Sequence, residues 1–597
     1  MTLTKDQEAK FQKLGISSVS ELALITPSSY EDLRISDKLT PHTFCVIDAT
    51  VESVHRAPNS IQITFFAHNF GHRLQGVLFR PKPYMMHQFQ VGERDYYYGN
   101  VECKAGACSM AMPRKVTTVG SIVAKYKSAL RTDVMVRLVE SVLSLENLKA
   151  EGIKEEIARE ILAIHFPTQG KASLKDISPQ KSHALKYLEL YTYMKQLATK
   201  RRYYNALTSQ VAECESWIKT LPFELTPEQR AAIEDIKHDL SLDVAAKRMV
   251  VGDVGSGKTM VILCAAMMNR EHRSLLMAPT TILANQLFEE AQKHTPQLRS
   301  VLVTNKTKKI DLSEYNFIIG THALLYRELP SASLVMVDEQ HRFGTQQRNM
   351  LEKLVSLGEK KPHFLQFSAT PIPRTQAMIE TAHIDVSLIT STPFTKNITS
   401  KVIGKKDFKA LLEHIRMEIA KEHQVLLVYP LVEQSEVLEY QSIDEARGYW
   451  EKNFDSVYVT HGKDKEKEQV LFDFRQRGKI LIATTVVEVG ISLPRLSTVV
   501  IVGAERLGLS TLHQLRGRVS RTGLQGYCYL YTNKEKAERL ERFVETTSGF
   551  DIANLDLKYR KSGDLLKGVN QSGSQFVWVD MGEDGDVVAE VKRDLGL

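Results

Sequence analysis

The apolar positions of the chain change period along its length, and these changes divide it into segments. Residues 5–24 carry apolar side chains at helical spacing, and Gly15 is placed as a helix cap. From Thr43 apolar and polar positions alternate in short runs, which predicts strands. From Leu221 short, continuously apolar runs alternate with helical segments, which predicts parallel sheets buried on both faces.

The strands after Thr43 predict a small barrel. They cover residues 44–51, 61–66, 73–80 and 95–101, with a last run near Val116. About five strands at this spacing suit the oligonucleotide-binding barrel, among other designs. Aromatic and basic side chains interleave here, which suits base stacking beside phosphate contacts. Aromatic residues also prefer strands and can simply fill a barrel, so the residues alone leave both interpretations open.

A helical segment follows between about Tyr126 and Ser216, with a polar break over residues 169–180. Its helix around residues 183–204 bears Lys186, Lys195, Lys200, Arg201 and Arg202 beside Tyr187, Tyr191 and Tyr193. A charge run of this kind is usually a solvated helix face. The alternative is an element that links a DNA-binding barrel to a motor.

Two sets of continuously apolar strands follow. The first set is 248–251, 275–278, 317–320, 334–337 and 364–367, and the second is 425–428, 457–459, 480–483 and 498–502. They predict an α/β architecture of two doubly wound parallel sheets in tandem. A nucleotide bound on the first sheet would then face the second across a cleft.

One octapeptide separates strand 248–251 from an apolar helix over 260–268. It reads Gly252-Asp253-Val254-Gly255-Ser256-Gly257-Lys258-Thr259 and matches the phosphate-loop motif in the strand–turn–helix context that the motif requires. Its backbone N–H groups and the helix N-terminus can hold a polyphosphate. We expect Lys258 to reach the β and γ phosphates and Thr259 to hold Mg²⁺. The alternative, a flexible Gly/Ser turn, leaves the flanking elements unexplained.

Adjacent carboxylates end the strand at 334–337. We expect Asp338 to hold Mg²⁺ through water and Glu339 to polarise the attacking water, because phosphoryl transfer needs a metal, a positioned water and positive charge on the transferring group. The hydroxyls of residues 368–370 end the next strand and could sense that site.

A second polar cluster, HQLRGRVSR over residues 513–521, belongs to the second sheet. Arg518 and Arg521 are three residues apart, so on a helix both would face one direction. Facing the γ phosphate, they would serve as arginine fingers from the second lobe. A basic surface helix is the alternative, but the phosphate loop and the carboxylates favour the catalytic interpretation.

Composition narrows the picture only slightly. The 597 residues are 25% charged and 43% hydrophobic, with a net charge of +7, which permits a polyanionic partner without proving one. The six cysteines are too scattered for a disulfide framework, and Cys103 and Cys108 lack the second pair that a zinc site needs. No signal peptide or membrane-spanning run is visible, which predicts a cytoplasmic protein without a membrane partner.

In this order the motifs resemble a superfamily 2 helicase motor. Residues 223–229 look like the adenine-reading Q motif, which implies adenine contacts for Phe223 and Gln229. Residues 278–286 and 320–324 resemble strand-tracking motifs of the first lobe, and 484–491 resembles that of the second. The resemblance implies phosphate-gripping roles for Thr280, Thr321 and Thr485, which would make translocation indifferent to sequence, and a catalytic role for Gln514.

The match narrows to the RecG family of bacterial branched-DNA helicases. The segments that carry this resemblance are DEQHRFG (338–344), FSATPIPRT (367–375), YPLVE (429–433), AERLGLS (504–510), LGI (14–16), PSSYED (27–32), GFDIA (549–553), DLKYR (556–560) and QSG (571–573). The resemblance implies a 3′–5′-type, ATP- and Mg²⁺-dependent translocase on double-stranded DNA. Its substrates would be stalled forks, Holliday junctions and R- or D-loops in repair and recombination.

The same resemblance implies an organisation. It comprises a wedge domain with an oligonucleotide-binding-fold barrel (1–125), a helical linker (126–216), two RecA-like domains (217–392 and 393–547) and a translocation motif with the C-terminal tail (548–597). Phe79 and Tyr84 align loosely with wedge aromatics that stack on bases at the branch point. The resemblance further implies a nucleoid-associated monomer, with a single-strand DNA-binding protein as a candidate partner.

The chain departs from the family pattern at two places. Ser520 and Thr522 replace a usual glycine and a usual small residue, and Lys561, Ser562 and Lys567 replace glycine, proline and glycine in the translocation motif.

Two rival functions remain. The transcription-coupled-repair translocase shares the motor but is far longer, and a DNA-binding scaffold with a decayed motor would not be expected to keep Lys258 and Glu339.

Overall fold

The computed structural model describes residues 3–82, 85, 87–104, 107–168, 177–308, 310–370, 374–394, 397–430, 440–462, 464–485, 493–520, 523–567 and 576–597. Two compact units are present. One comprises Met1–Tyr193 with Phe576–Val579, and the other comprises Met194–Gln575 with Asp580–Leu597.

The first unit holds a small helical subdomain. Its elements are α1 (Lys5–Leu14), α2 (Val19–Leu24), α4 (Thr132–Val142), α5 (Leu145–Ala150), α6 (Glu155–His165), the first part of α7 (Pro179–Thr199), and strands β1 (Ser29–Asp32) and β7 (Ile122–Lys125). Gly15 caps α1 with φ +71°, as its position predicted. The buried ring of His165 bonds Ala23 O at 2.8 Å and so ties α6 to α2. Residues before and after the barrel therefore share one core.

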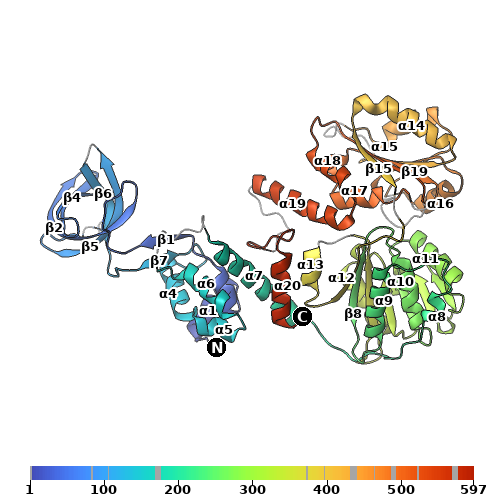
Figure 1. Ribbon diagram of the computed structural model, residues 1–597, viewed down its shortest axis with the longest axis horizontal. Coiled ribbons are helices and arrows are strands. Elements are labelled where there is room, and N and C mark those ends of the chain that lie inside the picture. The colour runs from blue at the N-terminus through green and yellow to red at the C-terminus, as the bar shows by residue number, and fades with distance from the viewer. Residues whose placement is uncertain are drawn as a thin grey trace. The chain divides into compact units, whose positions relative to one another are not determined.

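A closed five-stranded barrel is inserted between β1 and β7 (Figure 1). Its strands are β2 (Phe44–Ala57), β3 (Ser60–Ala67), β4 (His72–Phe79), β5 (Arg94–Lys104) and β6 (Ala107–Lys115), in the order β2-β3-β4-β6-β5. The predicted barrel is confirmed. The last predicted run, near Val116, corresponds to β6, which ends at Lys115; Val116 itself packs in a separate cluster outside the barrel core.

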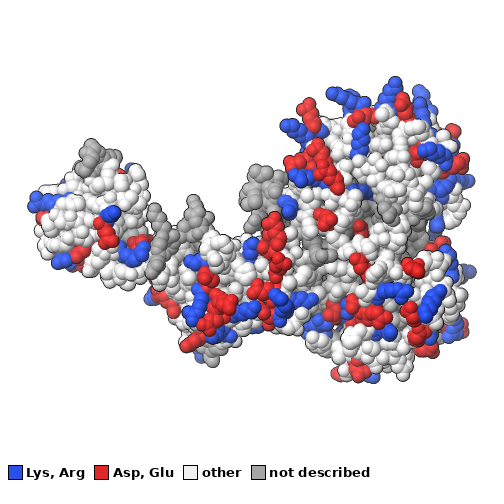
Figure 2. Space-filling view, viewed as in Figure 1, with Lys and Arg blue, Asp and Glu red and all other residues white. Residues whose placement is uncertain are grey.

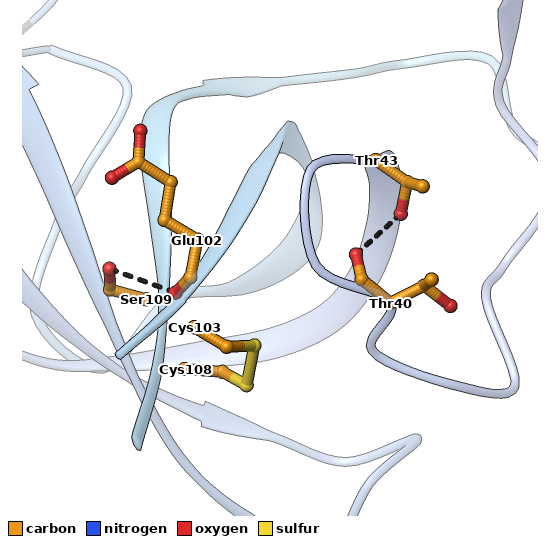
Figure 3. Close-up of a disulfide and its surroundings, with 6 residues drawn as sticks. All are labelled: Thr40, Thr43, Glu102, Cys103, Cys108 and Ser109. Atoms are coloured by element: carbon orange, nitrogen blue, oxygen red, sulfur yellow. Dashed lines mark hydrogen bonds between the residues drawn. A yellow bond between two sulfur atoms is a disulfide. The ribbon is translucent and has the colours of Figure 1, made fainter. Parts of the chain in front are cut away.

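The β5–β6 hairpin carries a disulfide. Cys103 lies directly opposite Cys108, and their sulfur atoms are bonded at 2.02 Å (Figure 3). From the sequence, this pair was considered only as zinc ligands. Spacing along the chain could not show that the hairpin register would make the two residues direct cross-strand neighbours. The part of the chain that the structure describes contains no cluster of three or more potential metal-ligating side chains.

The second unit begins with a seven-stranded sheet that is parallel throughout, in the order β10-β11-β9-β12-β13-β8-β14. Its elements are α8 (Glu215–Ile218), α9 (Pro227–Leu240), β8 (Lys247–Gly252), α10 (Lys258–Met268), β9 (Ser274–Met277), α11 (Thr281–His294), β10 (Ser300–Val303), β11 (Phe317–Gly320), β12 (Leu334–Val337), α12 (Thr345–Val355), β13 (His363–Ser368), α13 (Arg374–Glu380) and β14 (Asp385–Ile389).

Both faces of this sheet are covered. Along β12, Leu334 and Met336 pack with α9, α10 and α11, whereas Val335 and Val337 pack on the other face against residues of α12. Alternate residues of a strand point to opposite faces, so a sheet buried on both sides needs a continuously apolar strand. This is the pattern from which the sheet was predicted.

The second sheet has six strands, also parallel, in the order β15-β20-β19-β16-β18-β17. The lobe and the C-terminal helices comprise β15 (Ile398–Ile403), α14 (Phe408–Ala420), β16 (Gln424–Val428), α15 (Ile443–Asn453), β17 (Val457–Thr460), α16 (Lys467–Arg477), β18 (Ile480–Ala483), β19 (Leu496–Val502), α17 (Leu509–Arg516), β20 (Gly526–Tyr531), α18 (Glu538–Glu545), α19 (Gly549–Lys567) and α20 (Gly585–Leu595). Two tandem doubly wound lobes are therefore confirmed.

Surface charge does not form one broad basic face on the side shown. Lysine and arginine side chains are interspersed with aspartate and glutamate over the visible surface (Figure 2).

Among the helices that the structure describes, none combines the length and the apolar character needed to cross a bilayer.

Candidate active site

The octapeptide forms a closed loop between β8 and α10. Gly255 and Gly257 have φ values of +79° and +78°, a region that favours glycine. A side chain at Gly257 would also meet the amide of Gln229, since a Cβ there would lie 2.2 Å from Nε2. The Lys258 ammonium donates to the carbonyls of Gly252 at 2.7 Å and Asp253 at 3.0 Å. The loop and its lysine thus lie at the carboxyl end of β8, as the motif predicted.

Gln229 braces this loop from α9. Its Oε1 accepts the N–H of Thr226 at 2.8 Å, and its Nε2 donates to Ser256 O at 2.7 Å. Both ends of the amide are therefore engaged, and pairing with adenine would require these bonds to change. Phe223 is 44% exposed and makes an edge contact with the ring of His294, which leaves much of its surface accessible.

Asp338 and Glu339 follow β12, at the same edge of the sheet as the phosphate loop. Burial, reinforced by the neighbouring charge of Glu339 and opposed by Lys258, raises the pKa of Asp338 to about 7. Glu339 adopts φ +50°, and its Oε2 accepts the N–H of Ala369 at 3.2 Å. Asp338 is thus buried and lies in the field of Lys258, while the partly buried Glu339 is bonded to the residue that follows β13.

The segment 368–370 joins the two lobes. Ala369 binds Glu339, and the hydroxyl of Thr370 accepts a hydrogen bond from Gln514 Nε2 at 2.9 Å. Gln514 lies on α17 of the second lobe. Adjacent residues therefore make the contact with the carboxylate and the contact with the second lobe, which brings Gln514 close to the carboxylate pair.

The predicted helical placement is wrong for Arg518. Helix α17 ends at Arg516 with Gly517 as its cap, so Arg518 lies beyond the helix in the following turn. Ser520 then takes φ +63°, which no helix accommodates. Arg518 is buried, with 7% of its surface exposed. Arg521 lies outside the described residues.

Ser520 offers a test of this turn. A non-glycine residue at φ +63° costs about 1–2 kcal/mol, and its buried hydroxyl has no hydrogen-bond partner among the described residues. We expect Ser520→Gly to raise the free energy of unfolding by about 1 kcal/mol after its entropic cost, measured by calorimetry of thermal unfolding. Ser520→Ala is the matched control because it removes the hydroxyl but keeps the Cβ. A glycine variant no more stable than the alanine variant would contradict the strain.

Asp253, which the motif predicted only as a member of the phosphate loop, makes contacts well beyond the loop. Its carboxylate is buried and accepts three N–H groups: Val254 N at 2.6 Å, His513 Nε2 at 2.5 Å and Gly549 N at 3.1 Å. His513 belongs to α17, and Gly549 begins α19. The phosphate loop is therefore bonded through one side chain to the second lobe and to the C-terminal motif.

Arg516 fixes the His513 ring from the other side. Its Nη2 lies 3.1 Å from His513 Nδ1, its Nη1 donates to Phe543 O at 3.1 Å, and its guanidinium lies 4.3 Å from the Phe543 ring centroid. A guanidinium only donates, so Nδ1 accepts and Nε2 carries the proton toward Asp253. No periodic or motif signal marks this chain of contacts. The hint in sequence is a charged residue inside a buried loop.

The predicted DNA-contacting residues differ in how exposed their side chains are. Thr280 caps α11 and is partly exposed, whereas Thr321 caps a short turn and is 2% exposed. Thr485 is described and partly exposed, just after β18. Phe79 ends β4 with 56% of its surface exposed, while Tyr84 lies outside the described residues.

Tandem parallel-sheet lobes that bring a phosphate loop, a carboxylate pair and the second-lobe residues His513 and Gln514 together define a helicase motor. The first lobe matches the DEAD/DEAH box helicase model over residues 226–379, and the second matches the helicase conserved C-terminal domain over 406–523. The whole chain is 43% identical over 599 residues to the ATP-dependent DNA helicase RecG of Helicobacter pylori J99, covering 97% of this chain and 96% of that protein.

Two further comparisons agree. The RecG of Streptococcus pneumoniae is 31% identical, over 98% of this chain and 92% of its own length. A solved structure of RecG bound to a three-way DNA junction aligns with a TM-score of 0.58 and 26% identity, covering 100% of this chain and 84% of that one. The chain belongs to the RecG family of ATP-dependent DNA helicases.

Proposed function

We propose that this helicase uses ATP hydrolysis to pull branched duplex DNA against its barrel, which separates the arms at the junction. The observation that carries the proposal is the Asp253 contact, because it joins the phosphate loop to His513 and to Gly549 at the start of α19. A change at the γ phosphate would thereby reach the C-terminal motif. The related RecG solved with a three-way junction supports branched DNA as the substrate.

Within the nucleotide site we assign the following roles. Backbone N–H groups of residues 252–259 cradle the phosphates, with Lys258 on the β and γ groups, while Phe223 and Gln229 contact adenine. Glu339 polarises the attacking water. Gln514, Arg518 and Arg521 stabilise charge on the transferring phosphoryl group.

The residues present fit Mg²⁺. Burial and the neighbouring charge of Glu339 raise the pKa of Asp338, and a hard divalent cation would offset both effects; carboxylate and hydroxyl oxygens also suit Mg²⁺. Asp338 and Thr259 would hold the ion, which would neutralise developing phosphate charge. Thr259 lies at the start of α10 and is partly exposed, directly after Lys258.

The raised pKa of Asp338 predicts pH-dependent metal affinity. With a pKa of about 7, the carboxyl is mostly protonated at pH 6 and mostly ionised at pH 8. Mg²⁺ binds only the ionised form, so its affinity should rise up to roughly tenfold per pH unit below 7 and level off above 8. Titration of Mg²⁺ with a non-hydrolysable ATP analogue would measure this. Asp338→Asn, which does not titrate, controls for ionisation of the nucleotide, and an identical pH profile in it would contradict the prediction.

On the DNA side, we propose that Phe79 and Tyr84 stack on bases at the branch point. Thr280, Thr321 and Thr485 would hold backbone phosphates along the track. Thr321 is buried in this structure and would have to become accessible first. The domain boundaries at 125, 216, 392 and 547, the monomeric state and a single-strand DNA-binding partner remain part of this proposal.

ATPase and unwinding, measured side by side on linear, forked, three-way and four-way DNA at stated salt, test the function. We expect ATPase on all DNA but arm separation on branched substrates only. DNA binding without ATPase would indicate the scaffold alternative. ATPase with equal stimulation by linear and branched DNA and no arm separation would favour a translocase of the transcription-coupled-repair kind.

A further inference from the structure

A hollow of about 600 Å³ lies at the amino ends of β8 and β14, in the second unit. We call it the linker pocket. It is lined by the linker residues 200–204, the loop before β8, the end of α12, and Lys361, His383 and Asp385. The phosphate loop follows the opposite end of β8, six residues and therefore roughly 17–20 Å away. The linker pocket is thus separate from the ATP site.

The linker is fixed to this place by backbone bonds. Ala206 N donates to Asp243 O at 2.7 Å, Ala245 N to Tyr204 O at 2.8 Å, and Lys361 N to Asn205 O at 2.9 Å. Helix α7 ends at Thr199, so the basic residues that follow are not on a solvated helix face. They are held at the pocket rim.

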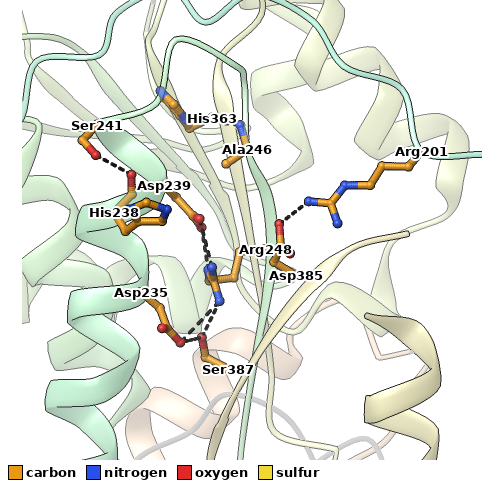
Figure 4. Close-up of polar contacts among 10 residues, drawn as sticks. All are labelled: Arg201, Asp235, His238, Asp239, Ser241, Ala246, Arg248, His363, Asp385 and Ser387. Atoms are coloured by element: carbon orange, nitrogen blue, oxygen red, sulfur yellow. Dashed lines mark hydrogen bonds and ion pairs between the residues drawn. The ribbon is translucent and has the colours of Figure 1, made fainter. Parts of the chain in front are cut away.

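The pocket carries a surplus of positive charge. Six lysines and arginines line it against three carboxylates. Two of those carboxylates are already engaged, since Asp385 pairs with Arg201 at 2.7 Å (Figure 4) and Glu352 bonds both Lys247 and Lys361. Burial alone would raise the pKa of Glu352. The hydrogen bonds and charges of Lys361 and Lys247 outweigh this effect and hold the pKa below its usual value.

Three cations remain without a carboxylate partner among the residues that the structure describes: Lys200, Arg202 and Lys353. Arg248, the next residue after the pocket-lining Lys247, shows the contrast. Its guanidinium bonds both oxygens of Asp239 and also Asp235 and Ser387 (Figure 4).

The field of these cations acts on Tyr204. A hydrogen bond from Arg202, reinforced by the charges of Lys361 and Lys247, lowers the pKa of its hydroxyl, and Lys361 Nζ lies 3.7 Å from its ring centroid. Tyr203 beside it is 68% exposed and offers an aromatic face at the rim. Cations that lack carboxylate partners, beside an exposed aromatic ring, are the combination that binds a phosphate together with a base.

We propose that the linker pocket is a second phosphate site, which binds the phosphate of a nucleotide unit whose base stacks on Tyr203. The unit belongs either to a DNA strand or to a free nucleotide, and both present the same chemistry. The DNA source deepens the proposed function and rests on it. Binding is measured without hydrolysis or unwinding, so failure here is distinguishable from failure of that function.

The test uses the full chain and a fluorescent single-stranded oligonucleotide over a range of salt concentrations. Replacing Lys200 and Lys353 together by glutamine is expected to weaken oligonucleotide binding about tenfold. The slope of the logarithm of the association constant against the logarithm of salt concentration should fall in magnitude by about 1.4, because each lost phosphate contact on a single strand removes about 0.7. Lys219→Gln, an exposed lysine on the same lobe outside the pocket, is the matched control and should change neither. ATPase without DNA should be unaffected in all of them.

Tyr203→Ala should weaken oligonucleotide binding by roughly tenfold, and Tyr203→Phe, which keeps the stacking face, should not.

For the free-nucleotide source, AMP is titrated into protein whose ATP site is saturated with a non-hydrolysable analogue. Loss of AMP binding with oligonucleotide binding intact assigns the pocket to a free nucleotide, and the reverse assigns it to DNA. If the variants bind both probes as the unmodified protein does, the phosphate site is overturned.

Discussion

Glu339→Gln should lower ATP turnover about 10²–10⁴-fold, the range expected when a general base is lost. The variant is close to isosteric, and its amide oxygen can still accept the N–H of Ala369, so the local fold should persist. Removing the charge also removes one cause of the raised pKa of Asp338. We therefore expect ATP binding to survive and the pKa of Asp338 to move toward its usual value, while kcat collapses.

Lys258→Ala separates binding from chemistry at the same site. The ammonium bonds two loop carbonyls and is placed for the phosphates, so its loss should weaken ATP binding as well as turnover. Glu234→Gln on the exposed face of α9 serves as the control for both and should leave ATPase unchanged. Kinetics with a fluorescent ATP analogue give kcat and KM separately. Hydrolysis within twofold of the unmodified protein in either site variant would refute the assignment.

The central strands of both sheets were predictable because they are buried on two faces and so are continuously apolar. Strands β9, β11, β12 and β18 fall within about one residue of their predicted positions. Strands β10, β14, β15 and β20 were missed. The first three lie at sheet edges and β20 lies inside its sheet, but all four have partly exposed residues that weaken the apolar signal. The edge strand β17 was found, so the continuity of the apolar run, rather than the position in the sheet, decided which strands could be predicted.

The site was predictable where a motif carries chemistry in adjacent residues. Lys258 and the carboxylate pair needed only their own segments. The Asp253–His513–Gly549 junction brings together residues almost 300 positions apart, and each looks ordinary in its own segment. The arginine placement failed for a related reason. Spacing alone predicted a helix that would carry both arginines. Helix α17 instead ends at Arg516 with Gly517 as its cap, and the left-handed backbone of Ser520 lies in the turn beyond it.

The barrel can be removed without cutting the core that surrounds it. Strands β1 and β7 pair antiparallel, with Asp32 opposite Ile122, so the two ends of the insertion lie side by side. A Gly/Ser linker of about four residues in place of residues 34–119 would join them as a hairpin. Truncating everything before Tyr126 would instead remove α1, α2 and β1 and uncover the buried face of the helices behind them.

The barrel-less variant should keep DNA-dependent ATPase within about twofold, because the phosphate loop and its partners all lie in the second unit. Separation of arms on a fork should fall roughly hundredfold, since each lost base-stacking contact is worth about 1–3 kcal/mol. Phe79→Ala is the matched point variant and should lose part of the same activity, with its exposed ring removed and the barrel core intact. Gel-based unwinding of forks and three-way junctions measures both. Normal arm separation by the barrel-less protein would show that the motor alone splits the junction and that the barrel has another task.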